Sequence, residues 1–258
     1  MNEQNPEVAR RGQSIAVPIA IVVGFGLIAA AIFFSGNQPT PTETTTTEEA
    51  ERVVDTNEEQ QGDLSALNPV TADDHILGDP NAPIVIVEYS DYDCPFCKNF
   101  HETMNRIMDE YGPTGDVAWV YRHFPLQNIH PAAPRIAAAA ECVADIGGNE
   151  AFWTFSDLVF AERGMNEPTN VARLDEFAET AGVNAAEMNA CLDAGNTQTD
   201  VEEDFTNGIA VGVRGTPYAV MVAGGEYIPI NGAQPYDTVK GIIDTTLATL
   251  QGAAPTAE

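Results

Sequence analysis

The 258-residue sequence predicts an α/β domain built in two halves around a helical region, and three observations lead to this prediction. A strand-like run at 84–89 that opens with four β-branched residues, a helical pattern at 98–111 and a second strand-like run at 117–124 follow one another. This order is typical of a parallel strand pair joined by a crossover helix. Residues 131–212 carry only helical patterns. The stretch 218–250 then returns to two short strands and a closing helix.

The chain begins with a candidate membrane anchor at residues 15–34, a run without a charged side chain. At about 1.5 Å per residue, such a helix spans the roughly 30 Å hydrocarbon core of a bilayer. Arg10 and Arg11 precede it, so the positive-inside rule predicts a single-pass protein with residues 1–14 in the cytoplasm and the remainder outside. A cleaved signal peptide is the alternative. The run is longer than a signal-peptide core and ends in large apolar residues at 32–34, which favours an uncleaved anchor.

Residues 35–69 are predicted to be a disordered acidic tether, because they are rich in Thr, Glu, Gln and Pro and poor in large apolar residues. The folded domain is expected at 70–252, and it begins with a turn-rich stretch at 73–80. The chain carries a formal net charge of -28. This charge argues against a nucleic-acid partner, because phosphate binding needs Lys and Arg.

The helical region divides into short segments at its glycines. A good helix-forming run at 136–143 ends near Gly147 and Gly148, and an apolar helical face follows at 152–160. The remaining predicted elements are helices at 171–181, 184–193 and 198–211, strands at 218–222 and 226–230 joined by a turn at 223–225, and a helix at 236–250.

A Cys-x-x-Cys motif, Cys94-Pro95-Phe96-Cys97, lies where the first strand passes into the first helix. Pro95 suits the first helical position, where its missing N–H costs nothing, so Cys94 is placed at the helix N-terminus. There the free backbone N–H groups and the helix dipole favour a thiolate, the nucleophilic form of cysteine. Cys97 lies one turn further on the same face and can resolve a mixed disulfide. The motif in this setting predicts thiol–disulfide chemistry.

Two structural interpretations of the motif stay open, a fixed disulfide and half of a zinc site. His101 follows Cys97 by one turn, but no second Cys or His pair completes four ligands. Covalent haem attachment is excluded in its usual form, because Lys98 stands where a histidine is required. The histidines of the chain are His75, His101, His123 and His130. No spacing among them demands a metal, so we expect them at the surface or in support of other side chains, and no metal or cofactor is predicted.

The order of elements and several motifs make residues from about 70 to 250 resemble the DsbA-like thiol–disulfide oxidoreductases, in their membrane-anchored bacterial form. The matching pieces are Cys94-Pro95-Phe96-Cys97, Glu88, Arg122-His123-Phe124-Pro125-Leu126 and Gly215-Thr216-Pro217. The resemblance implies a thioredoxin-like fold with a helical insertion at about 131–212. It also implies a cis bond before Pro217 beside the cysteine pair, where the Thr216 backbone would pair with an extended substrate.

The resemblance assigns a further role close to the cysteines. Glu88 resembles the family's buried carboxylate beneath the second cysteine, where a raised pKa would let it carry a proton to or from Cys97. The alternative for Glu88 is a solvent-exposed carboxylate at the sheet edge. The family usually has a histidine between the two cysteines, whereas Phe96 carries neither a donor nor a charge. We therefore expect a Cys94 pKa that is lowered, but less than in the most oxidising members.

The other two cysteines, Cys142 and Cys191, both lie in the predicted helical insertion. Outside the cytoplasm cysteines are expected to pair, so we predict a structural disulfide between them. The alternative is two buried free thiols that pack as small apolar residues.

These predictions together favour an enzyme that oxidises cysteine pairs of exported proteins with a Cys94–Cys97 disulfide, on the outer face of the membrane. By resemblance, a quinone-linked disulfide oxidase in the membrane would reoxidise the pair. Three alternatives stay open. They are a reductase or isomerase of the same fold, a metal-binding module using Cys94, Cys97 and His101, and a redox-inert adhesion or scaffold domain with two fixed disulfides.

Overall fold

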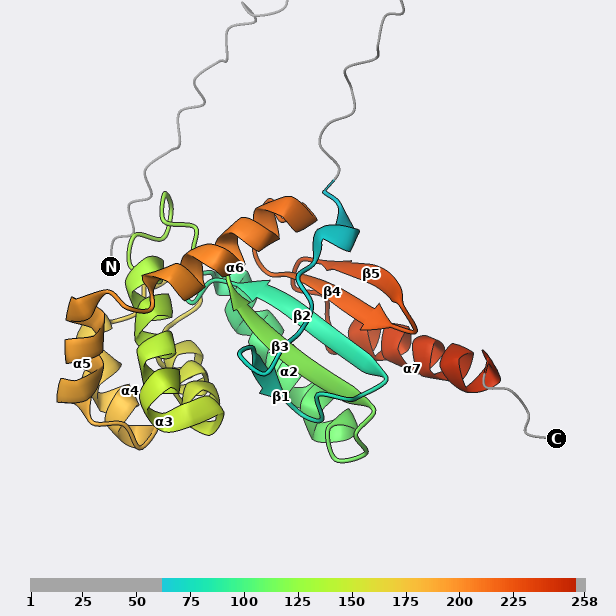
Figure 1. Cartoon of the computed structure of the whole chain (residues 1–258), viewed down its shortest axis with the longest axis horizontal. Helices are drawn as coiled ribbons and strands as arrows, with labels where there is room; N and C mark the ends of the chain where they lie inside the picture. The colour runs from blue at the N-terminus through green and yellow to red at the C-terminus, as the bar shows by residue number, and fades with distance from the viewer. Residues whose placement is uncertain (1–61, 254–258) are drawn as a thin grey trace, which may run out of the picture. The chain divides into compact units, whose positions relative to one another are not determined.

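The computed structural model describes residues 62–253, which form a five-stranded mixed sheet with helices on both faces (Figure 1). The strands are β1 (His75–Leu77), β2 (Ile84–Ser90), β3 (Val117–His123), β4 (Tyr218–Ala223) and β5 (Glu226–Asn231). They lie in the order β1-β3-β2-β4-β5. β2 and β3 run parallel, and the other neighbouring pairs are antiparallel. The predicted α/β class and its parallel pair are confirmed.

The helical elements follow the predicted order. They are η1 (Leu64–Ala66), α2 (Pro95–Tyr111), α3 (Ala133–Glu162), η2 (Val171–Arg173), α4 (Leu174–Thr180), α5 (Ala185–Ala194), α6 (Gln198–Val211) and α7 (Tyr236–Ala253). α3, α4 and α5 form a group to one side of the sheet (Figure 1), and α3 also packs against it through Trp153 and Trp119. The predicted break near Gly147 and Gly148 is a kink inside α3, where Gly148 adopts φ 79. Glycine takes this left-handed conformation without steric cost, so the helix resumes in a new direction.

The first part of the chain differs from its prediction in two places. Residues 62–69, which we assigned to the tether, hold η1 and a buried Leu67, and the Asn207 amide donates a hydrogen bond to the Ala66 carbonyl at 2.7 Å. The stretch 73–80 contains β1, a strand of three residues that is too short to leave a periodic pattern.

The predicted tail at 1–14, the predicted anchor at 15–34 and residues 35–61 of the predicted tether lie outside the described residues. Between residues 62 and 253, no helix has both the length and the apolar content that crossing a bilayer requires.

The sheet separates two apolar cores because alternate strand residues face opposite sides. On one face, Ile84 and Ile86 pack with Trp119 against α2, α3 and α7. On the other face, Val87 and Val120 pack against the end of α6 and the segment that follows η1. β2 is therefore covered on both sides, and its end is held firmly where the Cys-x-x-Cys motif begins.

Both outer strands of the sheet are poor templates for further pairing. β1 has only three residues, and β5 carries Pro229 opposite Val220. Proline lacks the N–H that a neighbouring strand would need, and within sheets it is confined to edge strands, strand starts and bulges.

Candidate active site

The Cys94–Cys97 pair lies at the junction of β2 and α2, as the sequence predicts. Cys94 is the N-cap residue of α2 and Pro95 is its first helical residue. The Cys94 N–H donates to the Asp91 carbonyl at 3.0 Å, which turns the chain out of the sheet and into the helix. Both thiols are free here, and the side chains are 3% exposed for Cys94 and 0% for Cys97. Phe96, between them, is 59% exposed.

The two thiols have very different acidity. A hydrogen bond from Cys97, together with Thr216 and the N–H groups of Cys97 and Phe96, lowers the pKa of Cys94 to about 6 against the effect of burial. Burial raises the pKa of Cys97 well above its usual value, and the neighbouring Cys94 raises it further. Cys94 is therefore the thiolate at neutral pH, and Cys97 stays protonated and donates to it. The direction agrees with the prediction for Cys94.

The loop before β4 lies beside Cys94. The Thr216–Pro217 peptide bond is cis, and the Cys94 Sγ lies 3.4 Å from the Thr216 carbonyl oxygen. The Thr216 hydroxyl is buried and has no hydrogen-bond partner elsewhere in residues 62–253. When Cys94 loses its proton, this hydroxyl can donate to the thiolate. The roles that the resemblance assigns to Thr216 and Pro217 stay predictions, but their placement beside Cys94 fits those roles.

Glu88 lies inside the protein, at 0% exposure, and not at a solvent-exposed sheet edge. The Trp119 Nε1–H donates to Glu88 Oε2 at 3.0 Å. Burial raises the pKa of Glu88 to about 7, and the neighbouring Ser90 hydroxyl and the Trp119 hydrogen bond only partly oppose this. The charge of Glu88 in turn raises the pKa of Cys97, which places the carboxyl and the second thiol within electrostatic reach of each other.

A second buried carboxylate, Asp91, holds the motif loop in place. This role was not predicted from the sequence. Its Oδ2 accepts from the Leu126 N–H at 2.7 Å and lies 2.9 Å from His130 Nδ1, and its own N–H donates to Cys97 Sγ at 3.4 Å. Asp91 also accepts from the Asp93 N–H through Oδ1 at 2.7 Å. The only signal in the sequence is that Asp91 lies between the strand and the motif, because the partners of its Oδ2, Leu126 and His130, come from a distant loop.

The histidines lie where they support other side chains, as His130 does beside Asp91, and not all of them are at the surface. His101 and His123 are buried, at 3% and 1% exposure, and His101 Nε2 lies 2.6 Å from Asp157 Oδ1. Within residues 62–253, Cys94, Cys97 and His101 do not bring three ligand atoms together as a metal site requires. The alternative of a metal-binding module on these three residues therefore gains no geometric support.

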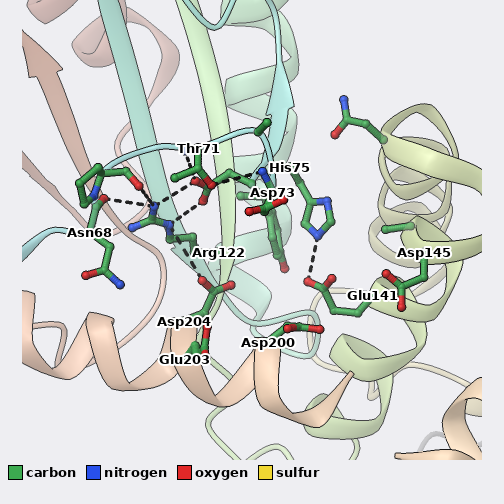
Figure 2. A pocket seen from close by; sticks show the side chains of 16 residues that line it. Asn68, Thr71, Asp73, His75, Arg122, Glu141, Asp145, Asp200, Glu203 and Asp204 are labelled. Atoms are coloured by element: carbon green, nitrogen blue, oxygen red, sulfur yellow. Dashed lines mark hydrogen bonds and ion pairs between the residues drawn. The ribbon is translucent and has the colours of Figure 1, made fainter. Parts of the chain in front are cut away.

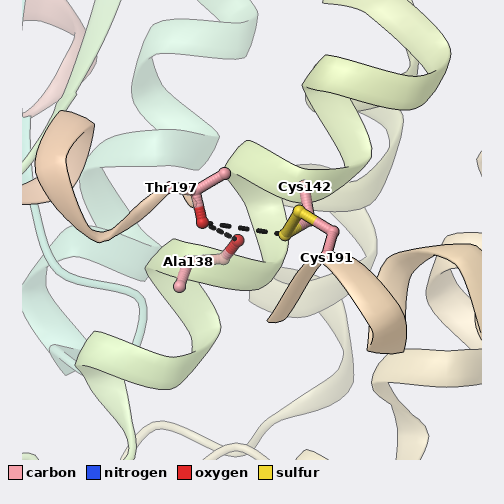
Figure 3. The surroundings of a disulfide bond; sticks show 4 residues. All are labelled: Ala138, Cys142, Cys191 and Thr197. Atoms are coloured by element: carbon pink, nitrogen blue, oxygen red, sulfur yellow. Dashed lines mark hydrogen bonds between the residues drawn. A yellow bond between two sulfur atoms is a disulfide. The ribbon is translucent and has the colours of Figure 1, made fainter. Parts of the chain in front are cut away.

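The predicted disulfide between Cys142 and Cys191 is present, and it joins α3 to α5 (Figure 3). Thr197 lies beside it and donates from Oγ1 to the Ala138 carbonyl at 3.1 Å. The disulfide lies inside the helical insertion, whereas the Cys94–Cys97 pair lies at the end of the sheet. The two cysteine pairs therefore have separate surroundings, one structural and one with the acidity of a reactive pair.

Comparisons with known proteins agree with this geometry. The sequence model of the thioredoxin family matches residues 70–245. The solved structure of Pseudomonas aeruginosa DsbA2 is 28% identical and covers 74% of this chain and 100% of its own, with a TM-score of 0.59. Oxidised BdbD from Bacillus subtilis is 23% identical, with a TM-score of 0.60, and covers 70% of this chain and 96% of its own. Wolbachia pipientis alpha-DsbA1 is 23% identical, with a TM-score of 0.61 over 72% of this chain and 96% of its own.

Curated relatives of similar sequence include Na(+)/H(+) antiporters. The Na(+)/H(+) antiporter NhaA 3 of Salinispora tropica is 35% identical over 117 residues, which are 45% of this chain and 17% of the antiporter. The NhaA 1 antiporter of Salinispora arenicola is 31% identical over 158 residues, 61% of this chain and 23% of that protein. The chain thus spans less than a quarter of the length of these two relatives.

The family model matches residues 70–245, and the solved structures share the fold over 70–74% of this chain. The chain therefore belongs to the thioredoxin family and has the fold of its DsbA-like thiol–disulfide oxidoreductases.

Proposed function

We propose that the protein oxidises cysteine pairs of exported proteins by exchanging its Cys94–Cys97 disulfide. A substrate thiolate attacks Cys94 Sγ, the Cys94–Cys97 bond breaks, and a mixed disulfide with Cys94 forms. A second substrate thiolate then attacks the substrate sulfur and releases the Cys94 thiolate. The substrate loses two electrons and two protons, and the enzyme pair gains them as a dithiol.

The observation that supports this direction is the lowered pKa of Cys94, about 6. A thiolate that is stable when released is a good leaving group, so a pair of this kind favours the reduced form and oxidises its partner. Cys97 has the opposite property, since its pKa is raised and its thiolate is a poor leaving group. Glu88, with a pKa of about 7, can supply the proton that Cys97 needs as it leaves.

The redox potential of the 94–97 pair tests the direction, measured on the full chain by equilibrium with glutathione. A potential of about −120 mV supports an oxidant, and one of about −270 mV supports the alternative of a reductase. The matched activity assay is the refolding of a reduced client protein. Cys94→Ser should abolish it, whereas the double variant Cys142→Ala and Cys191→Ala should retain it, because that disulfide lies in the insertion. Activity that survives Cys94→Ser would contradict the proposal.

We also propose that residues 15–34 anchor the chain in a membrane with the catalytic domain on the outer side, and that a quinone-linked membrane oxidase reoxidises the pair. Support for the anchor comes from the uncharged run and the two arginines before it. Carbonate extraction and protease protection of the full chain in cells test both the anchor and its orientation. A chain that extracts into the soluble fraction, or a domain protected by intact cytoplasmic membrane, would contradict this arrangement.

A further inference from the structure

Away from the cysteines, three metal-ligating side chains from distant parts of the sequence meet between the sheet and the insertion. His75 comes from β1, His123 ends β3, and Glu141 comes from α3. His75 Nε2 lies 2.9 Å from Glu141 Oε1, and His123 Nε2 lies 2.7 Å from the same oxygen. One ligand atom from each residue lies within 4.8 Å of the others. We call these three residues the His–His–Glu cluster.

The two imidazoles of the cluster differ in their hydrogen bonds. His75 and Glu141 meet the geometry of a hydrogen bond. His123 is only 1% exposed, and neither of its ring nitrogens has a hydrogen-bond partner among the described residues, because its approach to Glu141 has the right distance but not the right direction. A buried polar atom without a partner is destabilising, so a native structure normally supplies one. The partner here can be an ion that both imidazoles and the carboxylate share.

The rings of the cluster are held by packing. His75 stacks on Phe152 with ring centroids 3.6 Å apart, and His123 meets Phe152 and Tyr121 edge to face. Rings that are fixed in this way lose little freedom when they bind an ion.

A cavity of about 740 Å³ gives solvent a path to the cluster (Figure 2). Its lining includes His75 and Glu141 and the further carboxylates of Asp145, Asp200 and Glu203. A cavity lined by carboxylates raises the local concentration of cations. Figure 2 shows the His75–Glu141 contact at the side of this cavity that faces α3.

We propose that the His–His–Glu cluster binds one divalent transition-metal ion, with zinc as the ion of best fit. Two imidazoles and one carboxylate are a donor set that zinc accepts in four-coordinate sites, with water in the fourth position. Bonds of about 2.0–2.2 Å at tetrahedral angles separate ligand atoms by roughly 3.4 Å. The observed 2.7 and 2.9 Å must therefore open by about 0.5–0.7 Å, which a small rotation of the Glu141 side chain supplies. The bound ion would tie β1 and β3 to the helical insertion.

Zinc binding by the oxidised full chain tests the proposal. When both cysteine pairs are disulfides, no thiol competes for the metal. Equilibrium dialysis with excess Mg²⁺, which prefers oxygen ligands and occupies acidic surfaces, should give one Zn²⁺ per chain. At a Zn²⁺ concentration a hundredfold above Kd, the Tm should rise by roughly 5 °C or more.

Two matched pairs of variants locate the site. His75→Gln and Glu141→Gln should each weaken zinc binding by about tenfold or more. His130→Gln, the same change at another histidine, and Glu203→Gln, the same change in the same cavity, should leave the affinity within about twofold. Circular dichroism without zinc confirms that each variant is folded. The proposal is overturned if the wild type binds no zinc, if both cluster variants bind as well as the wild type, or if Glu203→Gln loses as much affinity as Glu141→Gln.

Discussion

The hydrogen bond from Cys97 is the largest single contribution that lowers the pKa of Cys94 to about 6, and replacing Cys97 with alanine isolates it. A hydrogen bond to a charged group is worth about 1.5–3 kcal/mol, and about 1.4 kcal/mol corresponds to one pKa unit. We therefore expect Cys97→Ala to raise the Cys94 pKa by about one to two units. At pH 7 the thiolate fraction should fall from about 90% to between about 10% and 50%.

The assay is the rate of alkylation of Cys94 by iodoacetamide as a function of pH, with thiolate absorbance as a second measurement. Because Cys142 and Cys191 are bonded to each other, Cys94 is the only free thiol of the variant. Cys97→Ser is the matched control, since its O–H can still donate, and it should titrate within about half a unit of the wild type. If the alanine variant titrates at about 6 like the wild type, the helix N-terminus and Thr216 suffice, and the reasoning about Cys97 is refuted.

Three further predictions concern stability, measured by urea denaturation. Removing the disulfide with Cys142→Ala and Cys191→Ala should cost about 4 kcal/mol, from its sequence separation of 49, and a loss below about 1 kcal/mol would contradict this. The pKa of Glu88 is raised from 4.5 to about 7, so the folded state favours its protonated form. The free energy of unfolding relative to Glu88→Gln should therefore fall by about 3 kcal/mol as the pH rises from about 4 to 8, and parallel pH curves would argue against it. Gly208→Ala would bring a Cβ within 2.7 Å of an aromatic ring and should cost about 1–3 kcal/mol, whereas Gly241→Ala, with open space, should not destabilise.

The sequence predicts the central part of the site well because its signals are local. The β-branched run, Pro95 at the first helical position and the spacing of the two cysteines together define a strand, a helix start and one helical face. The cis bond before Pro217 depends on the resemblance, since nothing in the local composition distinguishes it from a trans bond.

Contacts that depend on strand register could not be predicted in the same way. Trp119 reaches Glu88 because Ile86 pairs with Trp119 and Glu88 with Tyr121, which places both side chains on one face. A shift of one residue would turn Trp119 to the opposite side.

The His–His–Glu cluster was missed for a related reason. His75 and Glu141 are 66 positions apart, and β1 is too short to leave a pattern in the sequence. Spacing can reveal metal ligands only when they come from one element or one turn. Here the ligands come from three elements that only the folded chain brings together.

The short and proline-interrupted edges of the sheet bear on the proposed function, in which the protein would act on unfolded substrates. An unfolded chain is extended, and it can pair with the free backbone N–H and C=O groups of an exposed edge strand. On one edge, Pro229 in β5 lacks the N–H that a neighbouring strand would need. On the other edge, β1 has only three residues, which is too short for stable pairing. Under the proposed function, an extended substrate would therefore pair with the Thr216 backbone, whose carbonyl oxygen lies 3.4 Å from the Cys94 Sγ, rather than with an edge strand, and two copies of the protein would be poorly suited to pairing through their sheet edges.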